Sequence, residues 1–157
     1  MSKTQPIYLT ADGAVKLNAE LKELIGPQRE ALARRLRAAI QMGDLSENAD
    51  YHKAKEDQGF LEGRIQELEF VLRTAIIVET TNTPKDVVSV GARVTVQEED
   101  FGPEVFNLVG AQEADPRNGK ISHESPIGLA LMDHCVGETV EAQTPGGKIK
   151  ILILKIE

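Results

Sequence analysis

The first half of the chain carries a hydrophobic repeat in which apolar or small residues return in alternating steps of three and four. This spacing is that of one face of an α-helix, and it is sustained over two long stretches. The first helix is expected to begin at Thr10, a residue type that caps helices, and to run to about Met42. The second is expected to run from near Ser46 to about Thr74. At 1.5 Å per residue, each helix would be roughly 45 Å long.

The two repeats match each other when they are read in opposite directions, which predicts an antiparallel coiled-coil hairpin. The predicted layers are Leu17/Ala75, Leu21/Leu72, Leu24/Leu68, Gln28/Ile65, Ala31/Leu61, Arg35/Gln58, Ala38/Ala54 and Met42/Tyr51. The polar layer of Arg35 and Gln58 would fix the register at some cost in stability. Pro27 should kink or locally break the first helix, because proline has no amide hydrogen. Two separate amphipathic helices packed on the second half are the alternative.

From Ile76 the pattern changes to short β-type runs with turn residues between them. The predicted strands are residues 76–79, 93–97, 105–109, 138–143 and 148–156. Ser125 and Pro126 precede an apolar run over 127–132, which predicts a short helix with serine as its cap. Residues 80–86 are predicted to be a polar linker, and residues 145–147, Pro-Gly-Gly, a hairpin turn.

The predicted fold class is therefore α+β. A long amino-terminal antiparallel coiled-coil hairpin is expected in residues 1–78, and a small β-rich domain in residues 79–157.

Composition narrows the possible functions. Hydrophobic residues make up 41% of the chain, but aromatic residues only 4%, which argues against a large aromatic-lined ligand pocket. No apolar run is long enough to span a bilayer, and the amino terminus lacks a signal-peptide pattern, so no membrane contact is expected. The single Cys135 excludes an internal disulfide framework and fits a cytoplasmic location.

The formal net charge of −7 is concentrated in the second half. Residues 1–75 carry 11 Lys and Arg against 12 Asp and Glu, whereas residues 76–157 carry 7 against 13. An acidic half is unsuited to gripping phosphates by releasing their counterions. Binding of duplex DNA by the chain alone is therefore not expected.

The connection between the predicted helices reads Gly-Asp-Leu-Ser-Glu-Asn-Ala-Asp-Tyr-His over residues 43–52, and it places Asp44 and Glu47 three residues apart at the hairpin tip. One interpretation is a capping box, in which an acidic or hydroxyl residue and a Glu three positions later start a helix. The other is metal recruitment, because Mg²⁺ takes one or two carboxylates and fills its other positions with water or phosphate oxygens. Two acids on an exposed tip would hold such an ion weakly, but could complete a two-metal arrangement inside another molecule's site.

Basic residues are predicted just below these acids. In the predicted register Arg37 and Lys55 lie at the same level across the hairpin, roughly 10 Å from the tip. Arg34 and Lys53 are near them in the sequence. Such a patch could hold the backbone of a short single strand of nucleic acid. Ordinary solvated helix charges are the alternative interpretation.

Further short motifs occur along the chain, at Leu9-Thr10, residues 58–65, 114–116, Ile121-Ser122, 124–127, Val136-Gly137 and 144–147. Together with the tip sequence they closely resemble the bacterial transcript cleavage factors of the GreA/GreB family, the GreA type in particular. The resemblance covers nearly the full length, and the tip motif is its most specific part. Leu129 and residues 133–135 depart from it, since family members often carry basic residues there.

The resemblance implies that the coiled coil enters the secondary channel of bacterial RNA polymerase, while an FKBP-like carboxy-terminal domain docks on the channel rim. It implies that the chain stimulates the polymerase's own cleavage of the RNA 3′ end in backtracked complexes and is not itself an enzyme. Asp44 and Glu47 fall on the family's tip acids, which would stabilise the second Mg²⁺ and orient the attacking water. Lys55 falls on the family's basic position, where it would contact RNA together with Arg37.

Two other functions fit this shape. A channel-binding inhibitor would occupy the pore without promoting cleavage, but such a plug needs no pair of carboxylates. An autonomous metal-dependent hydrolase is disfavoured, because two ligands on an exposed tip without a pocket make a poor site. The chain is expected to be a monomer that does not stably bind Mg²⁺ alone.

Overall fold

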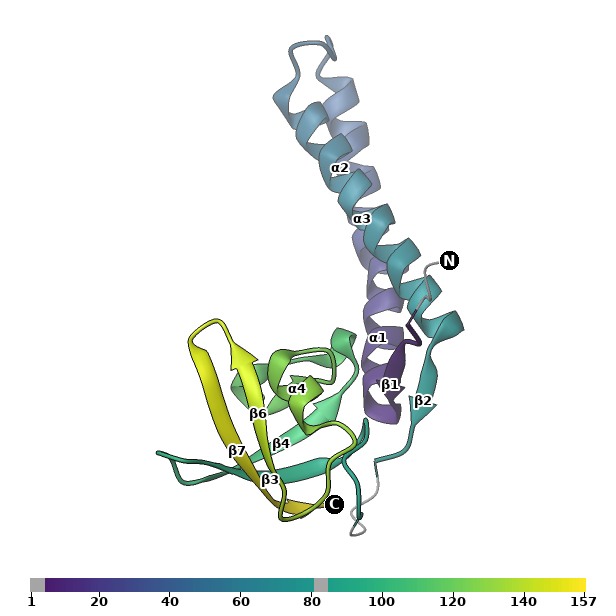
Figure 1. The fold of residues 1–157 in the computed structure, drawn as a ribbon. Helices are drawn as coiled ribbons and strands as arrows, with labels where there is room; N and C mark the ends of the chain where they lie inside the picture. The colour runs from purple at the N-terminus through teal and green to yellow at the C-terminus, as the bar shows by residue number, and fades with distance from the viewer. Residues whose placement is uncertain (1–4, 81–84) are drawn as a thin grey trace. The chain divides into compact units, whose positions relative to one another are not determined.

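A computed structural model describes residues 5–80 and 85–157 of the chain. It contains two compact units, which are drawn together in Figure 1. One unit is Ala14–Thr74, and the other combines Ala75–Glu157 with the amino-terminal residues up to Gly13. The sequence predicted a single boundary after residue 78. The structure differs because β1 (Tyr8–Thr10) and β2 (Ile76–Val78) form a parallel pair, which places both in the second unit.

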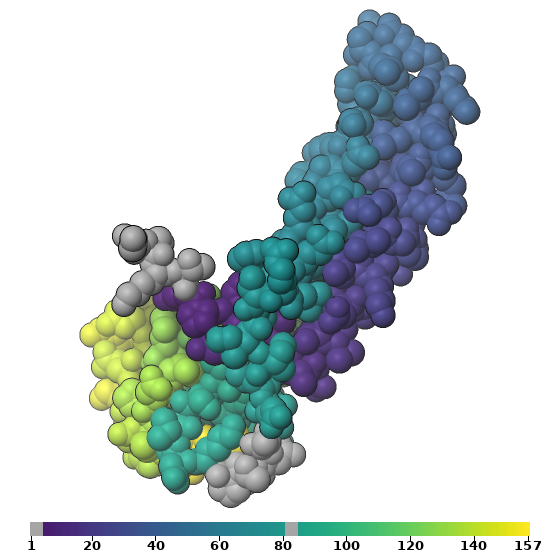
Figure 2. Space-filling view, turned by 90° about the vertical axis from the view of Figure 1, so that its right-hand side faces the viewer, coloured from purple at the N-terminus to yellow at the C-terminus, as the bar shows by residue number. Residues whose placement is uncertain are grey.

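The first unit is a helical hairpin. Its first arm consists of α1 (Ala11–Glu23), which enters this unit at Ala14, a π-helical turn η1 (Leu24–Gln28) and α2 (Arg29–Gln41). Its second arm is α3 (Ala49–Thr74). Ion pairs join Arg29 to Glu62 at 2.8 Å and Arg35 to Asp57 at 3.0 Å, so residue numbers rise along one arm as they fall along the other. The predicted antiparallel hairpin is confirmed, and Figure 2 shows its arms packed along each other.

Pro27 is accommodated by a π-helical turn. Proline cannot donate to the carbonyl four residues earlier, and the amide of Arg29 donates to the Leu24 carbonyl, five residues earlier. This hydrogen-bond pattern places one additional residue in the turn. Beyond it, the buried positions of the first arm are Leu32 and Ala39, one residue later than the predicted Ala31 and Ala38, which are exposed.

The predicted polar layer of Arg35 and Gln58 is wrong for the same reason. Arg35 is exposed, and both terminal nitrogens of its guanidinium donate to Asp57 Oδ2 at 3.0 Å on the flank of the hairpin. Leu36 takes the half-buried position instead. The second arm follows the prediction more closely. Its buried residues are Ala54, Ile65 and Leu68, with Val71 in addition.

The second unit is built on a five-stranded sheet of order β5-β4-β3-β7-β6. The strands are β3 (Arg93–Glu98), β4 (Pro103–Val109), β5 (Lys120–Ser122), β6 (Thr139–Thr144) and β7 (Gly147–Ile156). Only the β4–β5 pair is parallel among these described strands. The predicted α+β class is confirmed. β1 and β5 were missed, because three residues are too few to show a period of two.

The core of this unit lies between the sheet and the short helix α4 (Pro126–Leu131), and Figure 1 shows the sheet curling around that helix. Alternate strand residues point inward, as the period of two requires. The largest fully buried core side chains are Val88, Val94, Leu108, Leu131, Ile153 and Ile156. The predicted cap of α4 is confirmed, since Ser125 Oγ accepts from the amide of Gly128 at 3.0 Å.

The predicted hairpin turn is also confirmed, because Thr144 pairs with Gly147 and the φ of Gly147 is 119°. The predicted linker of residues 80–86 lies mostly outside the described residues. Among the described residues, no helix combines the length and the apolar character needed to cross a membrane.

The start of α1 is anchored within the second unit by residues far apart in sequence. Thr10 Oγ1 accepts from the amide of Gly13 at 3.1 Å, which confirms Thr10 as the helix cap. The Glu113 carboxylate, from the turn η2 (Ala111–Glu113), accepts from the Thr10 amide at 2.7 Å and from the Thr10 hydroxyl. A Cβ atom on Gly13 would lie 2.1 Å from Glu113 Cδ, so a larger residue at this position would displace the Glu113 carboxylate from Thr10.

Candidate functional site

The tip loop, residues 42–48, connects the two arms of the hairpin, because α2 ends at Gln41 and α3 begins at Ala49. The amide of Gly43 donates to the Ile40 carbonyl at 3.4 Å, and Gly43 has a φ of 110°, which favours glycine. Asp44 and Glu47 both lie in this loop and are exposed. The structure therefore places both acids in the exposed loop at the end of the hairpin.

Asp44 is held by its own loop through one carboxylate oxygen. Its Oδ1 accepts from the Ser46 hydroxyl at 2.8 Å and from the Ser46 amide at 3.0 Å. Both hydrogen bonds favour the ionised form and hold the pKa of Asp44 below its ordinary value. The bond from the Ser46 hydroxyl contributes more than the bond from the amide. The other oxygen, Oδ2, accepts no hydrogen bond from the described residues. An ionised carboxylate with a free oxygen can bind a cation.

The capping-box interpretation of the tip is wrong. The helix does not begin near Ser46 but at Ala49, and its cap is Asn48, whose Oδ1 accepts from the Tyr51 amide at 3.0 Å. Asp44 bonds the residue two positions later rather than three. No hydrogen bond of the Glu47 side chain is recorded among the described residues. Neither acid is therefore needed to start the helix.

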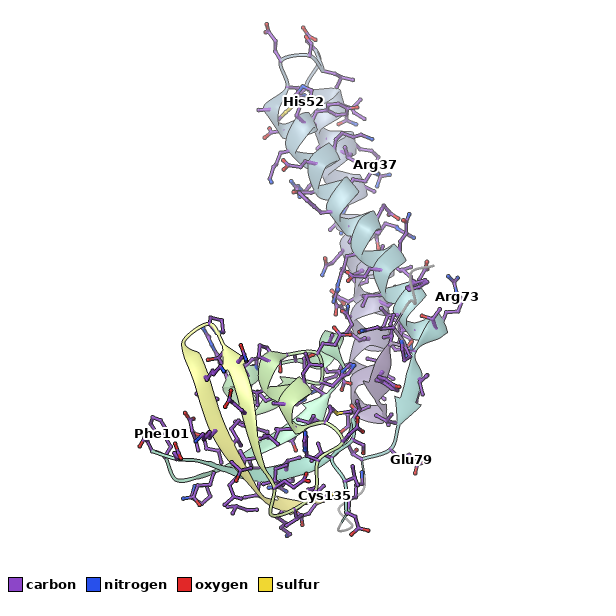
Figure 3. The ribbon with its side chains drawn as sticks, viewed as in Figure 1. Arg37, His52, Arg73, Glu79, Phe101 and Cys135 are labelled. Atoms are coloured by element: carbon purple, nitrogen blue, oxygen red, sulfur yellow. The ribbon has the colours of Figure 1, made fainter. Side chains whose placement is uncertain are left out.

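Asn48 was missed by the sequence reasoning, although asparagine is among the preferred helix caps. Besides capping α3, its Nδ2 donates to the Ala39 carbonyl of α2 at 2.7 Å. His52, labelled near the tip in Figure 3, places its Nε2 atom 3.4 Å from the Ser46 carbonyl oxygen. The loop is thus tied to both helices below it.

The tip acids alone do not form a complete metal site. Among the described residues there is no group of three or more His, Cys, Asp or Glu side chains that could hold a metal ion. Mg²⁺ prefers six oxygen ligands in an octahedron and keeps several waters when few carboxylates are available. The residues fit a shared ion, for which Asp44 and Glu47 supply one or two ligands and another molecule supplies the rest.

Two of the four predicted basic residues converge near Gln58. Lys55 Nζ donates to Gln58 Oε1 at 3.0 Å. Arg37 and Gln58 line a shallow groove of about 400 Å³ together with Arg29, Leu32, Ala33, Leu36, Leu61 and Glu62. Figure 3 shows Arg37 on the hairpin below His52. Within the described part of the chain Arg37 makes no ion pair, so its charge is available to an anionic ligand.

The other two predicted basic residues form ion pairs with acids of their own helix. Arg34 pairs with Glu30 at 3.1 Å, and Lys53 pairs with Asp57 at 3.2 Å and with Glu56 at 3.6 Å. These exposed pairs within one helix lower the local positive charge. Arg37 and Lys55 are therefore the better candidates for contact with a phosphate backbone.

The positions that depart from the family pattern lie on the surface of the second unit. Leu129 is 65% exposed on α4. In the following turn, Glu138 Oε2 accepts from the Cys135 amide at 2.7 Å and lies 3.0 Å from His134 Nδ1. The bond from the Cys135 amide, and to a smaller extent the contact with His134, lower the pKa of the Glu138 carboxyl. His134 and Cys135 thus take part in a hydrogen-bonded turn.

Comparison with known proteins finds matches along nearly the whole chain. Residues 7–77 match the family described as "Transcription elongation factor, N-terminal", and residues 83–157 match "Transcription elongation factor, GreA/GreB, C-term". The chain is 42% identical to transcription elongation factor GreA of Limosilactobacillus fermentum, with 100% of both sequences covered. It is 44% identical to the GreA factor of Clostridium beijerinckii, over 99% of this chain and 98% of the relative.

A crystal structure of GreA factor homolog 1 (Gfh1) from Thermus thermophilus is also similar. It is 26% identical in sequence and covers 98% of this chain and 99% of that one, with a TM-score of 0.44.

Proposed function

Because this chain belongs to the GreA/GreB family of transcription elongation factors, we propose that it stimulates the cleavage of the RNA 3′ end by RNA polymerase in backtracked complexes. The observation that carries the proposal is the tip loop. Its two exposed acids are not needed to start the following helix, and one of them is kept ionised with an oxygen free. Carboxylates in that state suit delivery to a cation held by another molecule.

The hairpin suits entry into the secondary channel of the polymerase. Near the tip loop the buried residues of the two arms are alanines, Ala39 and Ala54. Small residues at a contact let two helices approach closely. The arms are consequently thin where they would pass through a narrow opening.

In this proposal Asp44 and Glu47 hold the second Mg²⁺ of the cleavage reaction jointly with the polymerase. A magnesium ion in such a two-metal site stabilises the attacking and leaving oxygens and lowers the pKa of a bound water. The chain's own contribution is to bring two anionic ligands and to orient the attacking water through them. The remaining ligands and the catalytic scaffold belong to the polymerase, so no cleavage is expected from this chain alone.

Arg37 and Lys55 would hold the RNA. Lys55 donates to Gln58, and Arg37, on the other arm, lines the same groove as Gln58 and is not neutralised by an ion pair within the described residues. Cations along a groove bind a single strand through its backbone without reading its sequence. This placement would keep the RNA 3′ segment close to the tip acids.

The test measures cleavage of 3′-proximal RNA in a backtracked RNA polymerase complex, with and without this protein. Asp44→Asn retains an oxygen that accepts both Ser46 hydrogen bonds, so it removes the charge and preserves the loop. Glu47→Gln likewise removes only a charge. We expect each substitution to lower the stimulated rate by roughly 100-fold, as for the loss of one electrostatic group in an active site.

The matched control is Glu56→Gln, which neutralises another exposed acid of the hairpin and loses only a 3.6 Å contact with Lys53. It should stimulate cleavage as the unaltered chain does. Normal stimulation by both tip variants would refute metal recruitment. Inhibition of the polymerase without cleavage would identify a channel-binding inhibitor instead, and RNA cleavage without polymerase would identify a hydrolase.

A further inference from the structure

Asn48 joins the two arms of the hairpin at the base of the tip loop. Its side-chain amide donates through Nδ2 to the Ala39 carbonyl at 2.7 Å and accepts through Oδ1 from the Tyr51 amide at 3.0 Å. The Ala39 carbonyl belongs to the last turn of α2, and the Tyr51 amide to the first turn of α3. Amides in the first turn of a helix, such as that of Tyr51, have no carbonyl partner within their own helix. One side chain therefore bonds terminal groups of both helices.

The main chain of Asn48 closes the loop as well. Its amide donates to the Leu45 carbonyl at 3.5 Å, and its carbonyl accepts from the His52 amide at 3.1 Å. On the other side, the Ala39 carbonyl also accepts from the Met42 amide at 3.1 Å. Asp44 and Glu47 lie between these two attachments.

We propose that Asn48 is a positioning residue, which clamps the two arms below the tip loop and holds Asp44 and Glu47 at a separation that suits one shared ion. The inference rests on the proposed function of the tip. Two carboxylates repel each other when no cation lies between them. A loop free to spread would separate the acids, and binding an ion would then have to restore their order at an entropic cost. A clamp at the base of the loop removes much of that cost before the ion arrives.

The proposal depends on the chemistry of an amide side chain. Asparagine has an acceptor for the Tyr51 amide and a donor for the Ala39 carbonyl. Serine and aspartate cap helices nearly as well, through an oxygen acceptor. Aspartate, however, has no donor when ionised, and serine is too short to span both helices. Asn48→Ser and Asn48→Asp therefore keep the cap and remove the bridge, whereas Asn48→Ala removes both.

The first measurement is the Mg²⁺ concentration that gives half-maximal stimulated cleavage in a backtracked complex, at saturating factor. For Asn48→Ser and Asn48→Asp we expect this concentration to rise about tenfold, as when a group that orients a metal ligand is removed. The rate at saturating Mg²⁺ should recover to near that of the unaltered chain. Asn18→Ser is the matched control, because Asn18 Nδ2 also donates to a helix carbonyl, that of Ala14 at 3.0 Å, far from the tip in sequence.

The second measurement separates positioning from folding. Circular dichroism should show unchanged helix content in both cap-retaining variants, and hydrogen exchange should show the Tyr51 amide still protected. In Asn48→Ala that protection should be lost. A cap-retaining variant that lost helix content and was not rescued by Mg²⁺ would show a merely structural role and overturn the proposal.

Asp44→Asn in the same assay separates failure of the inference from failure of the proposed function. If Asp44→Asn lowers cleavage while both cap-retaining Asn48 variants keep the unaltered dependence on Mg²⁺, the positioning role is refuted and the tip proposal stands. If Asp44→Asn also behaves as the unaltered chain, both are refuted.

Discussion

The two helical arms begin with capped helices, but the carboxylates beside the two caps are used differently. At the start of α1, Thr10 is 5% exposed, and Glu113, 103 residues away in sequence, directs both of its oxygens to Thr10. At the start of α3, the cap is Asn48, a neutral residue, and the nearby acids Asp44 and Glu47 remain exposed. The base of the hairpin uses a carboxylate to hold the fold, whereas the tip leaves its carboxylates available.

The two ends of the hairpin therefore differ in whether their carboxylates can act on another molecule. A half-buried carboxylate that satisfies the amide and hydroxyl of a buried residue, as Glu113 does for Thr10, cannot be withdrawn without loss of stability. An exposed carboxylate in a loop that is capped by another residue can change partners at little cost. The contrast predicts that substitutions at the tip change activity and spare stability, while those at the base do the reverse.

The largest expected effect on stability is that of Glu113→Ala. It leaves the buried amide and hydroxyl of Thr10 without their acceptor, and each unsatisfied buried polar group costs on the order of 1–3 kcal/mol. Thermal or urea unfolding should show a loss of about 2 kcal/mol or more. Stimulated cleavage at a temperature where the variant is folded should stay near normal.

Glu47→Gln is the complementary variant. It should leave the free energy of unfolding unchanged and lower the stimulated cleavage rate by roughly 100-fold. If Glu47→Gln destabilised the chain as much as Glu113→Ala, the contrast between the tip carboxylates and the carboxylate at the base would be refuted.

A smaller effect is expected within the first arm, where the π-helical turn shifts the buried face by one residue. Deletion of Pro27 would remove the additional residue and leave Leu32, Leu36 and Ala39 in phase with Leu17 and Leu24. We expect the variant to form the same hairpin with equal or higher thermal stability, because an uninterrupted α-helix replaces the π-helical turn.

Deletion of Ala33 is the matched control, since it removes one exposed residue beyond the turn and places Leu36 and Ala39 out of phase. This deletion should destabilise the hairpin by about 2 kcal/mol or more through lost burial. Equal melting temperatures for the two deletions would contradict the assigned phase shift.

The smallest expected effect concerns pH. The Ser46 hydroxyl is the main cause of the lowered pKa of Asp44, so the carboxylate stays ionised as the pH falls until it reaches that lowered pKa. Ser46→Ala removes the hydroxyl bond and leaves the amide bond, which should raise the pKa toward its ordinary value. Carboxyl NMR should show Asp44 titrating at higher pH in this variant. Stimulated cleavage should accordingly decline at a higher pH on acidification, and coincident pH profiles would contradict the role of Ser46.

Local patterns in the sequence predict much of the molecule. The steps of three and four from Leu17 to Leu24, and again along α3, predict a hairpin because the helical period is a local property of the chain. Ser125 and Pro126 predict the start of α4 by chemistry contained within four residues. Gly43 and the polar residues after it place Asp44 and Glu47 in a loop for the same reason.

Other features depended on the tertiary structure. Continuous periodicity placed Arg35 in the interface, but one additional residue at Pro27 turned it outward to Asp57. Sequence spacing favoured Asp44 or Ser46 as the start of α3, because both are good cap residues. Asn48 takes that position, and its amide also reaches Ala39 on the opposite arm.

Most of the helices and strands, their order and the exposed position of the tip acids could be predicted from the sequence, because they follow from the polarity and turn preference of neighbouring residues. The phase of the first arm, the clamp at Asn48 and the pairing of Glu113 with Thr10 became visible in the folded molecule alone. A hydrogen-bond partner is selected by distance in space and not by distance along the chain. Residues 9 or 103 positions apart meet only after the backbone between them has folded.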